Sequence, residues 1–462
     1  MARLTATTAT GDAPAGGAPT RPQTLALAVV ATAILLGRGW GSWRRLHWEE
    51  ALPVGGAITR AIWRNLDDQA YGTLLPRLIL EVATLGPLPH LPVVTFAAAS
   101  AVWIVCMLVV ARALAPTLGP AWAAVAGLTL ALVPLPDVAM QGNVWNSFWP
   151  MWVALATWIA AGAEPRTRKG AGAVGAGALL VAASNPIAPV LAVPLAWRLV
   201  RRRRWRSADG LALAGLAAGT AFSAACHLLQ EPQTAYLGLW HPDTPEEHRA
   251  FKTIYEAGAT ATRGVAGPDL GGLVARAPGT ARYVLTQAMP APWNARLLEP
   301  GSTGTLAIAI AVAGVLVALA AWSARGGARA VAGRLAALAV LGVGAQYVLV
   351  SEMRTAQYVF VPVACGWICA AILAGSAARA GAARPLGVVP LLLVGAVAAV
   401  QTFRDGRDAE IDRYPSTAAW ADGLARARAE CAGLGPEDVV LISQDETYWM
   451  DAPVFVRCRH LD

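Results

Sequence analysis

Long apolar runs separated by short polar segments follow one another along most of the chain. Runs of about 18–22 residues match the thickness of a bilayer's hydrocarbon core, so they predict transmembrane helices. We therefore expect an all-α polytopic membrane protein with about eleven spans. The predicted spans are residues 23–37, 91–113, 120–138, 147–162, 171–183, 186–199, 208–229, 303–322, 330–350, 357–376 and 385–402.

The two shortest spans, 171–183 and 186–199, meet at Ser184-Asn185-Pro186. Two arrangements fit this pattern: one long broken helix, or a hairpin whose tip reaches the far surface. Only the hairpin keeps all the later basic segments on one side of the membrane.

Lysine and arginine concentrate in every second loop between the predicted spans. The positive-inside rule places these loops in the cytoplasm. We therefore expect a multi-pass protein of the plasma (inner) membrane, with the N-terminus inside and the C-terminus outside. Arginine runs are also typical of anionic-lipid sites, a reading that stays open. The residues concerned are Arg166, Arg168, Lys169, Arg198, Arg201 to Arg204, Arg206, Arg325, Arg329, Arg334, Arg379 and Arg384.

The pattern divides the chain into three parts. Residues 1–22 contain few bulky apolar side chains and predict a disordered cytoplasmic tail. Residues 23–402 form the transmembrane domain, with long outer loops at 38–90 and 230–302. Residues 403–462 are more polar and predict a small outer appendage.

Two interfacial helices are expected in the first outer loop. Ile58, Ile62 and Leu66 recur at helical spacing and predict an amphipathic helix in the membrane interface. A second, more apolar helix begins near Leu75 and carries Arg77.

The appendage combines a helix with two short strands. Ser416 can cap a helix that runs to about Ala432, and residues 439–442 and 454–456 read as strands. Of six cysteines, only Cys431 and Cys458 lie outside the predicted spans. A disulfide between them is favoured over free thiols, since this part of the chain is expected in the oxidising compartment.

Composition excludes several classes of function. The chain is 56% hydrophobic and 14% charged, and its net charge of +8 is explained by the basic loops rather than by nucleic-acid binding. No nucleotide-binding Walker motif, HExxH motif, file of ionisable residues or internal repeat occurs, which weighs against ATP-driven transport, zinc-protease chemistry and common secondary transport. No cofactor is predicted, and the sequence shows no convergent set of metal-ligating side chains.

The most concentrated chemistry lies in the stretch from Trp40 to Glu50. Glu49 and Glu50 are adjacent carboxylates near the predicted membrane surface, where one could act as a general base. Pairing with Arg44 and Arg45 is the competing interpretation. Asp67 and Asp68 are alternative acids, with a solvated helix end as their plainer role.

Other polar groups recur where predicted spans meet the outer face. Arg77 and Arg354 could hold a lipid phosphate, because a guanidinium forks onto phosphate oxygens. Trp145 and other tryptophans suit either sugar stacking or an interface belt. The remaining candidates are Asn143 and Asn146, which could instead be helix caps, and Tyr358.

These features resemble the GT-C superfamily, polytopic glycosyltransferases that use a polyprenyl-phosphate sugar or, in some members, an oligosaccharide donor. The resemblance rests on acids in the first outer loop at Trp48-Glu49-Glu50, a following interfacial helix, and an outer C-terminal appendage. It also rests on the segment from Arg354 to Tyr358, which resembles the RY segment that enters a late span. Typical members carry Asp in the first loop, whereas both acids here are Glu.

A narrower resemblance is to a group of uncharacterised actinobacterial polytopic membrane proteins. It rests on four short motifs: Trp48-Glu49-Glu50, residues 71–77, residues 142–149 and Ser184-Asn185-Pro186.

The resemblance implies transfer of a sugar from a polyprenyl-phosphate donor to a cell-envelope glycan, lipid or protein at the outer face. Glu49 or Glu50 would be the base, and Arg354, with Arg77, would bind the donor phosphate. The alternative is a non-catalytic membrane protein that binds or flips a lipid-linked envelope precursor.

Overall fold

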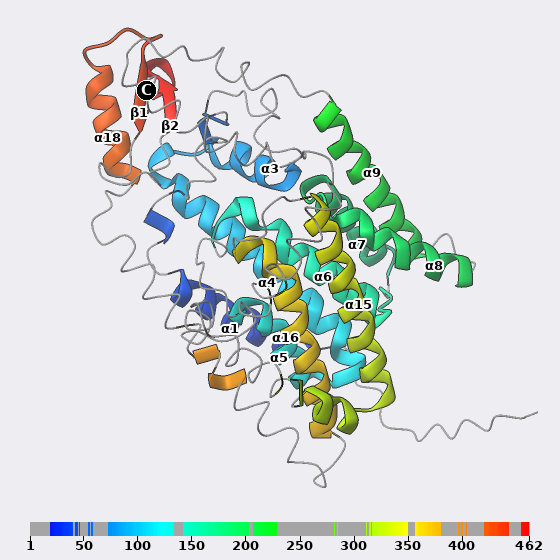
Figure 1. Cartoon of the computed structure of the whole chain (residues 1–462). Coiled ribbons are helices and arrows are strands. Elements are labelled where there is room, and N and C mark those ends of the chain that lie inside the picture. The colour runs from blue at the N-terminus through cyan, green and yellow to red at the C-terminus, as the bar shows by residue number, and fades with distance from the viewer. Residues whose placement is uncertain are drawn as a thin grey trace, which may run out of the picture.

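The computed structural model describes residues 19–39, 42–44, 46, 54–55, 57–58, 73–133, 142–165, 167–202, 207–228, 281, 284, 311, 314–315, 317–349, 356–379, 395–397, 399–400, 403, 420–442 and 454–461. These residues form a mostly helical protein with a small appendage at its C-terminal end (Figure 1).

Four helices within these residues are long and apolar enough to cross a membrane: Leu88–Leu118, Ala208–Cys226, Gly326–Val348 and Val359–Arg379. They indicate a membrane-embedded protein, as the sequence predicts. The count of eleven predicted spans stays a prediction, because several other described helices are short and the predicted span 385–402 lies largely outside the described residues.

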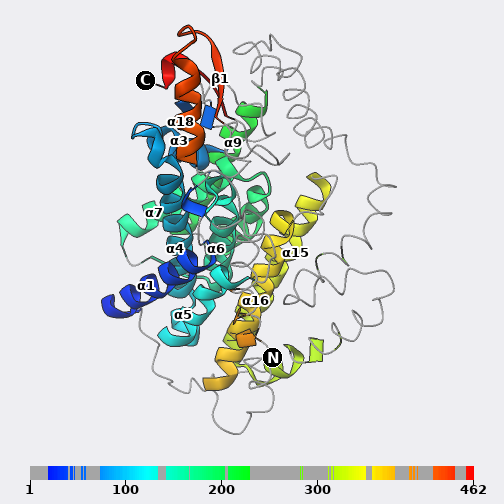
Figure 2. The ribbon, with the colours of Figure 1, turned by 90° about the vertical axis from the view of Figure 1, so that its left-hand side faces the viewer.

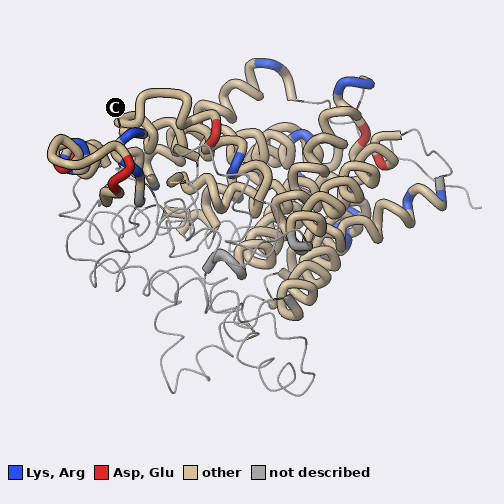
Figure 3. Tube along the Cα trace, turned by 90° about the horizontal axis from the view of Figure 1, so that it is seen from above, with Lys and Arg blue, Asp and Glu red and all other residues tan. Residues whose placement is uncertain are grey.

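The centre of the bundle is α6 (Phe148–Ala161), which is apolar on every side and almost entirely buried. Around it pack α4 (Leu91–Leu118), α15 (Gly326–Leu349) and α16 (Ala356–Arg379). Trp103 of α4 meets Phe360 of α16 edge-on, with ring centroids 5.4 Å apart. Figure 3 shows that charged residues are confined to a few short stretches of the described chain.

Helix α5 (Pro120–Leu128) continues as a 3-10 turn, η3 (Thr129–Leu132). Within the described residues η3 ends at Leu132, and residues 134–138 of the predicted span lie outside them. Val133 is extended, with ψ at 127°. It precedes Pro134, and a residue before proline is sterically disfavoured in the helical region.

Helix α1 (Arg21–Arg38) crosses the outside of α4 and α5 and begins with a capping box between Thr20 and Gln23. Its last residue is buried. The Arg38 guanidinium donates to the carbonyl of Ala131, so α1 is fixed to the end of η3.

Helices α7 (Arg168–Ser184) and α9 (Ala208–Leu228) pack against each other along their length (Figure 1). Glycines allow this close approach. A Cβ added to Gly215 would lie 2.1 Å from the carbonyl oxygen of Gly175, and one added to Gly219 would lie 2.4 Å from that of Leu179. Small residues at such positions are typical of helix pairs in membranes.

The segment after α7 turns back, which confirms the hairpin interpretation. A 3-10 turn, η6 (Ala188–Leu191), leads into α8 (Ala192–Arg202). Arg198 donates to the carbonyl of Ile159, near the end of α6, at 2.9 Å. It also pairs with Asp209, in the first turn of α9, at 3.0 Å.

The bundle has two distinct ends. At the basic end, Arg379 donates to the carbonyl of Thr117 and the amide of Arg325 donates to Ser376, so the α4–α5 and α15–α16 pairs meet there. The other end, which we call the capped end, carries α3 (Leu74–Ala83), the 3-10 turns η1 (Ser42–Arg44), η2 (Leu88–His90) and η5 (Val144–Asn146), the hairpin tip and the appendage. Figure 2 shows the appendage above α3 at this end.

The appendage contains α18 (Trp420–Cys431), a two-stranded antiparallel sheet and the 3-10 turn η8 (Cys458–His460). Strands β1 (Val439–Ile442) and β2 (Val454–Arg457) confirm both predicted strands. The disulfide Cys431–Cys458 is present, as the sequence predicts.

The appendage is joined to the bundle by the buried Trp420, whose indole N–H donates to the carbonyl of Leu88 at 2.7 Å.

Candidate functional site

Helix α3 buries an arginine among apolar side chains and exposes other aliphatic side chains. Arg77 is only 1% exposed, together with buried Pro76 and Leu80, whereas Leu78 and Val82 are 41% and 64% exposed. An amphipathic helix in an interface directs its aliphatic side toward an apolar environment. The arrangement leaves the Arg77 guanidinium pointing into the protein at the capped end.

The start of α3 is held by an unusual backbone conformation at Thr73. Its φ is 41°, in the left-handed region, which is sterically unfavourable for a β-branched residue. The Thr73 hydroxyl accepts a hydrogen bond from Nε of Arg77 at 2.9 Å. Such strain, of order 1–3 kcal/mol, persists only where the surroundings fix it, and it clusters at functional sites.

The hairpin tip supplies a second wall. The Leu75 amide donates to the Ser184 hydroxyl at 3.0 Å, which ties the first turn of α3 to the end of α7. Ser184 and Asn185 are both fully buried. Asn185 Oδ1 accepts from the Ile187 amide at 3.0 Å and so shapes the turn, as Asx residues do.

Residues 142–149 form the third wall. Gly142 has a φ of +84°, and a Cβ there would lie 2.5 Å from the Phe96 ring, so both backbone and space require glycine. Asn143 Oδ1 accepts from the Trp145 amide at 2.8 Å and caps η5. The capping role that the sequence left open for Asn143 is therefore confirmed.

Arg77 and Trp145 meet between these walls. The Arg77 Cζ lies 5.8 Å from the centroid of the Trp145 ring, within the range of a cation–π interaction. Asn146 and Ser147 are also buried beside Trp145 in the chain. The structure thus brings together Arg77 and Trp145 from the predicted site and places Asn143 and Asn146 immediately next to Trp145.

The predicted acids, Glu49, Glu50, Asp67 and Asp68, lie outside the described residues. Described residues on either side of the first pair are packed at the capped end. Leu46 and Val54 belong to the same apolar cluster as Trp145 and Leu80, and this cluster continues into the appendage.

Arg354 also lies outside the described residues. Tyr358 is in the first turn of α16, although its side chain is not described.

Sequence reasoning missed two buried residues near the capped end, Thr73 and Gln346. Gln346 is 1% exposed in α15. In the sequence, Gln346 stands out as a lone amide in an apolar span. A polar side chain there is energetically unfavourable in a membrane and marks a candidate functional site. Thr73 carried no comparable signal.

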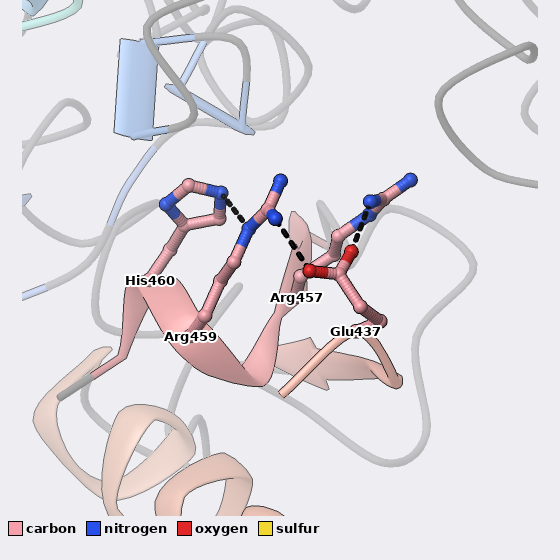
Figure 4. Close-up of polar contacts among 4 residues, drawn as sticks. All are labelled: Glu437, Arg457, Arg459 and His460. Carbon is pink, nitrogen blue, oxygen red and sulfur yellow. Dashed lines mark hydrogen bonds and ion pairs between the residues drawn. The ribbon is translucent and has the colours of Figure 1, made fainter. Parts of the chain in front are cut away.

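A separate polar cluster lies on the appendage (Figure 4). Glu437 accepts from both Arg457 and Arg459, and Arg459 Nε donates to His460 Nε2 at 3.3 Å. Partial burial, followed by the charges of Arg459 and Arg457, lowers the pKa of His460 below its ordinary value, and Glu437 opposes this effect. The described residues contain no group of three or more His, Cys, Asp or Glu side chains that could hold a metal ion.

Comparison with known proteins gives no relative: no protein-family model, curated protein or solved structure matches the chain.

Proposed function

We propose that the chain is a GT-C-type membrane glycosyltransferase. It would transfer a sugar from a polyprenyl-phosphate donor to a cell-envelope glycan, lipid or protein. The capped end would face outward and the basic end would face the cytoplasm, in agreement with the positive-inside rule. The transmembrane domain would have a GT-C-like fold with about eleven spans.

The observation that carries this proposal is the buried Arg77 over Trp145 at the capped end. A guanidinium is always charged, and its planar fork matches phosphate oxygens. Its Nε is oriented by Thr73. An indole beside it offers an aromatic face, which suits a sugar ring. A phosphate-binding group beside an aromatic surface matches the two parts of a sugar-phosphate lipid.

The proposed base is Glu49 or Glu50. Only two residues of chain separate Glu49 from Leu46, which packs in the apolar cluster containing Trp145. On the other side, three residues separate Glu50 from Val54, which belongs to the same cluster. The flanking contacts support a position for the acids at the capped end. A carboxylate there would remove the proton of the acceptor hydroxyl as it attacks the sugar.

A second candidate is a non-catalytic protein that binds or flips a lipid-linked envelope precursor. The observation that favours it is the chemistry of the described capped-end residues. The buried polar groups Arg77, Asn143, Asn146, Ser184 and Asn185 all suit binding, and none of them is a carboxylate. Such a protein would bind the lipid-linked substrate without turnover.

The test is conservative removal of each carboxylate in the full-length protein, in a strain that lacks the endogenous chain. Glu49→Gln and Glu50→Gln preserve size while removing the base. Loss of transfer in one of them by about 100-fold or more, with normal folding, supports the enzyme. If both variants keep full transfer, the assigned base is wrong. If wild type binds the lipid-linked sugar but transfers nothing, the binding function replaces the catalytic one.

A further inference from the structure

The side chain of Gln346 is buried without a hydrogen-bond partner among the described residues. Both its Nε2 and its Oε1 are inaccessible, and the residue is 1% exposed. A buried amide without a partner destabilises the folded state, and most buried amides are satisfied. The position of this one shows what it could contact.

Gln346 lies on the buried side of α15, facing the start of α6. One turn earlier, a Cβ added to Gly342 would lie 3.0 Å from the Trp152 ring of α6. Helix α15 runs toward the capped end and α6 runs away from it, so the next turn of α15 faces the preceding turn of α6. Gln346 is therefore directed toward the first turn of α6, which follows η5 in the chain.

A second buried amide comes from the hairpin tip. Asn185 is 0% exposed, and its Nδ2 has no hydrogen-bond partner in the described part of the chain, although its Oδ1 is used in the turn. The following turn, η6, packs against α15. Two buried amides with free hydrogen-bonding capacity thus lie at the capped end, one on α15 and the other just before η6, which α15 contacts, although they are 161 positions apart in the chain.

The chemistry of these groups selects a ligand class. Gln346 needs a partner that donates to Oε1 and one that accepts from Nε2, and Asn185 needs an acceptor. A phosphate cannot donate when fully ionised, and an ammonium cannot accept. A hydroxyl group does both, and neither amide carries a charge that would attract an ion.

We propose that Gln346 and Asn185 bind the hydroxyl groups of a neutral, hydroxyl-rich ligand at the capped end. This inference rests on the proposed function insofar as that ligand is the sugar of the lipid-linked donor. Arg77 would then bind the charged part and the two amides would bind the neutral part. A site built to hydrogen-bond a hydroxyl discriminates strongly against an analogue that lacks it.

A buried water molecule also satisfies an amide, so the experiment must separate a ligand site from a hydrated core. The full-length protein is reconstituted in lipid nanodiscs as wild type, Gln346→Leu, Asn185→Leu and Val348→Ala. Val348 is the matched control, because it lies two residues from Gln346 and is 50% exposed. The probes are polyprenyl phosphate, mannosyl and arabinosyl polyprenyl phosphates, and the methyl glycosides of those sugars.

The expected result has two parts. Gln346→Leu should raise the melting temperature of the ligand-free protein, because the unpartnered amide is removed. The same variant should weaken binding of a glycosyl polyprenyl phosphate by about tenfold or more. Its binding of polyprenyl phosphate without the sugar should be unchanged. Asn185→Leu should weaken binding of the glycosylated lipid similarly, although loss of its hydrogen bond in the turn should also lower the melting temperature. Val348→Ala should bind every probe as wild type does.

The outcomes distinguish this inference from the proposed function. If wild type binds a glycosylated lipid and Gln346→Leu binds it equally well, the amide is hydrated and the inference is wrong, whereas the proposed function survives. If wild type binds neither lipid but is stabilised by a methyl glycoside, and Gln346→Leu removes that effect, the hydroxyl site stands and the proposed function does not. If no probe binds wild type, both are overturned.

Discussion

Arg77 lies over the indole ring of Trp145, with its Cζ 5.8 Å from the ring centroid, and the two residues are 68 positions apart in the chain, at 77 and 145. The contact joins α3 to η5, the 3-10 turn that precedes α6. It places a permanent positive charge inside the capped end, where Thr73 holds its Nε. This relationship underlies both the proposed phosphate contact and the stability of α3.

Replacing Arg77 by lysine keeps the charge but removes the planar group over Trp145 and the donor to Thr73. We expect the free energy of unfolding to fall by about 1–3 kcal/mol. Binding of polyprenyl phosphate should weaken by about tenfold or more, because a lysine does not form the bidentate contact. The exposed Arg329 at the basic end supplies the control, Arg329→Lys. If a titration shows that both variants bind polyprenyl phosphate with the same affinity, Arg77 is not part of the phosphate site.

Gly215 tests the packing of α7 against α9. A methyl group there meets the carbonyl oxygen of Gly175, so Gly215→Ala should lower stability by about 1–3 kcal/mol through overpacking. Gly177 of α7 has nothing within 4 Å of an added Cβ. Gly177→Ala should therefore leave stability unchanged or raise it by up to about 1 kcal/mol. Thermal unfolding in nanodiscs measures both, and a fall of the same size in both would contradict the packing argument.

The disulfide should stabilise the appendage in particular. Cys431 and Cys458 are 27 positions apart in the chain, and closing such a loop contributes about 2–4 kcal/mol in the unfolded-chain entropy account. The Cys431→Ser, Cys458→Ser double variant should become sensitive to limited proteolysis within residues 420–461. Wild type treated with a reductant should show the same cleavage. Unchanged protection in both would show that the docking through Trp420 is sufficient.

Acidification should loosen the same appendage through His460. Burial and two arginines lower the pKa of this imidazole in the folded protein, so the unfolded state binds the proton more tightly. The contribution of His460 is fully present above the unfolded pKa of about 6.5 and is lost as the pH falls through the folded pKa. His460→Gln should flatten this dependence, measured as the rate of proteolysis of the appendage between pH 7.5 and pH 5. An unchanged profile in the variant would assign the effect to another group.

Much of the helical pattern could be predicted because apolar runs and basic loops follow directly from membrane physics. The hairpin around Asn185 and the strands after Val439 are examples in which the local pattern agrees with the fold. The early end of η3 could also have been inferred from Pro134, which follows Val133 in the sequence.

The site was harder to predict, because a helix that is apolar on all sides does not show which side meets its neighbours. Gln346 lies one turn after Gly342, which packs against the Trp152 ring of α6, and this relation depends on how two distant helices pack. Likewise, the inward direction of Arg77 depends on its contacts with Thr73 and Trp145. Spacing along α3 alone puts Leu80 on the same face as Arg77 but does not show that this face is the buried one.

The most direct test of the central claim is an analysis of the cell envelope in a strain that lacks this protein. Its glycans and lipids would be analysed by mass spectrometry, with complementation by wild type, Arg77→Ala and the control Arg329→Ala. The account predicts an acceptor that accumulates one sugar short, restored by wild type and Arg329→Ala but not by Arg77→Ala. An envelope with every glycan complete and at its normal level in the deletion strain would contradict the glycosyltransferase assignment.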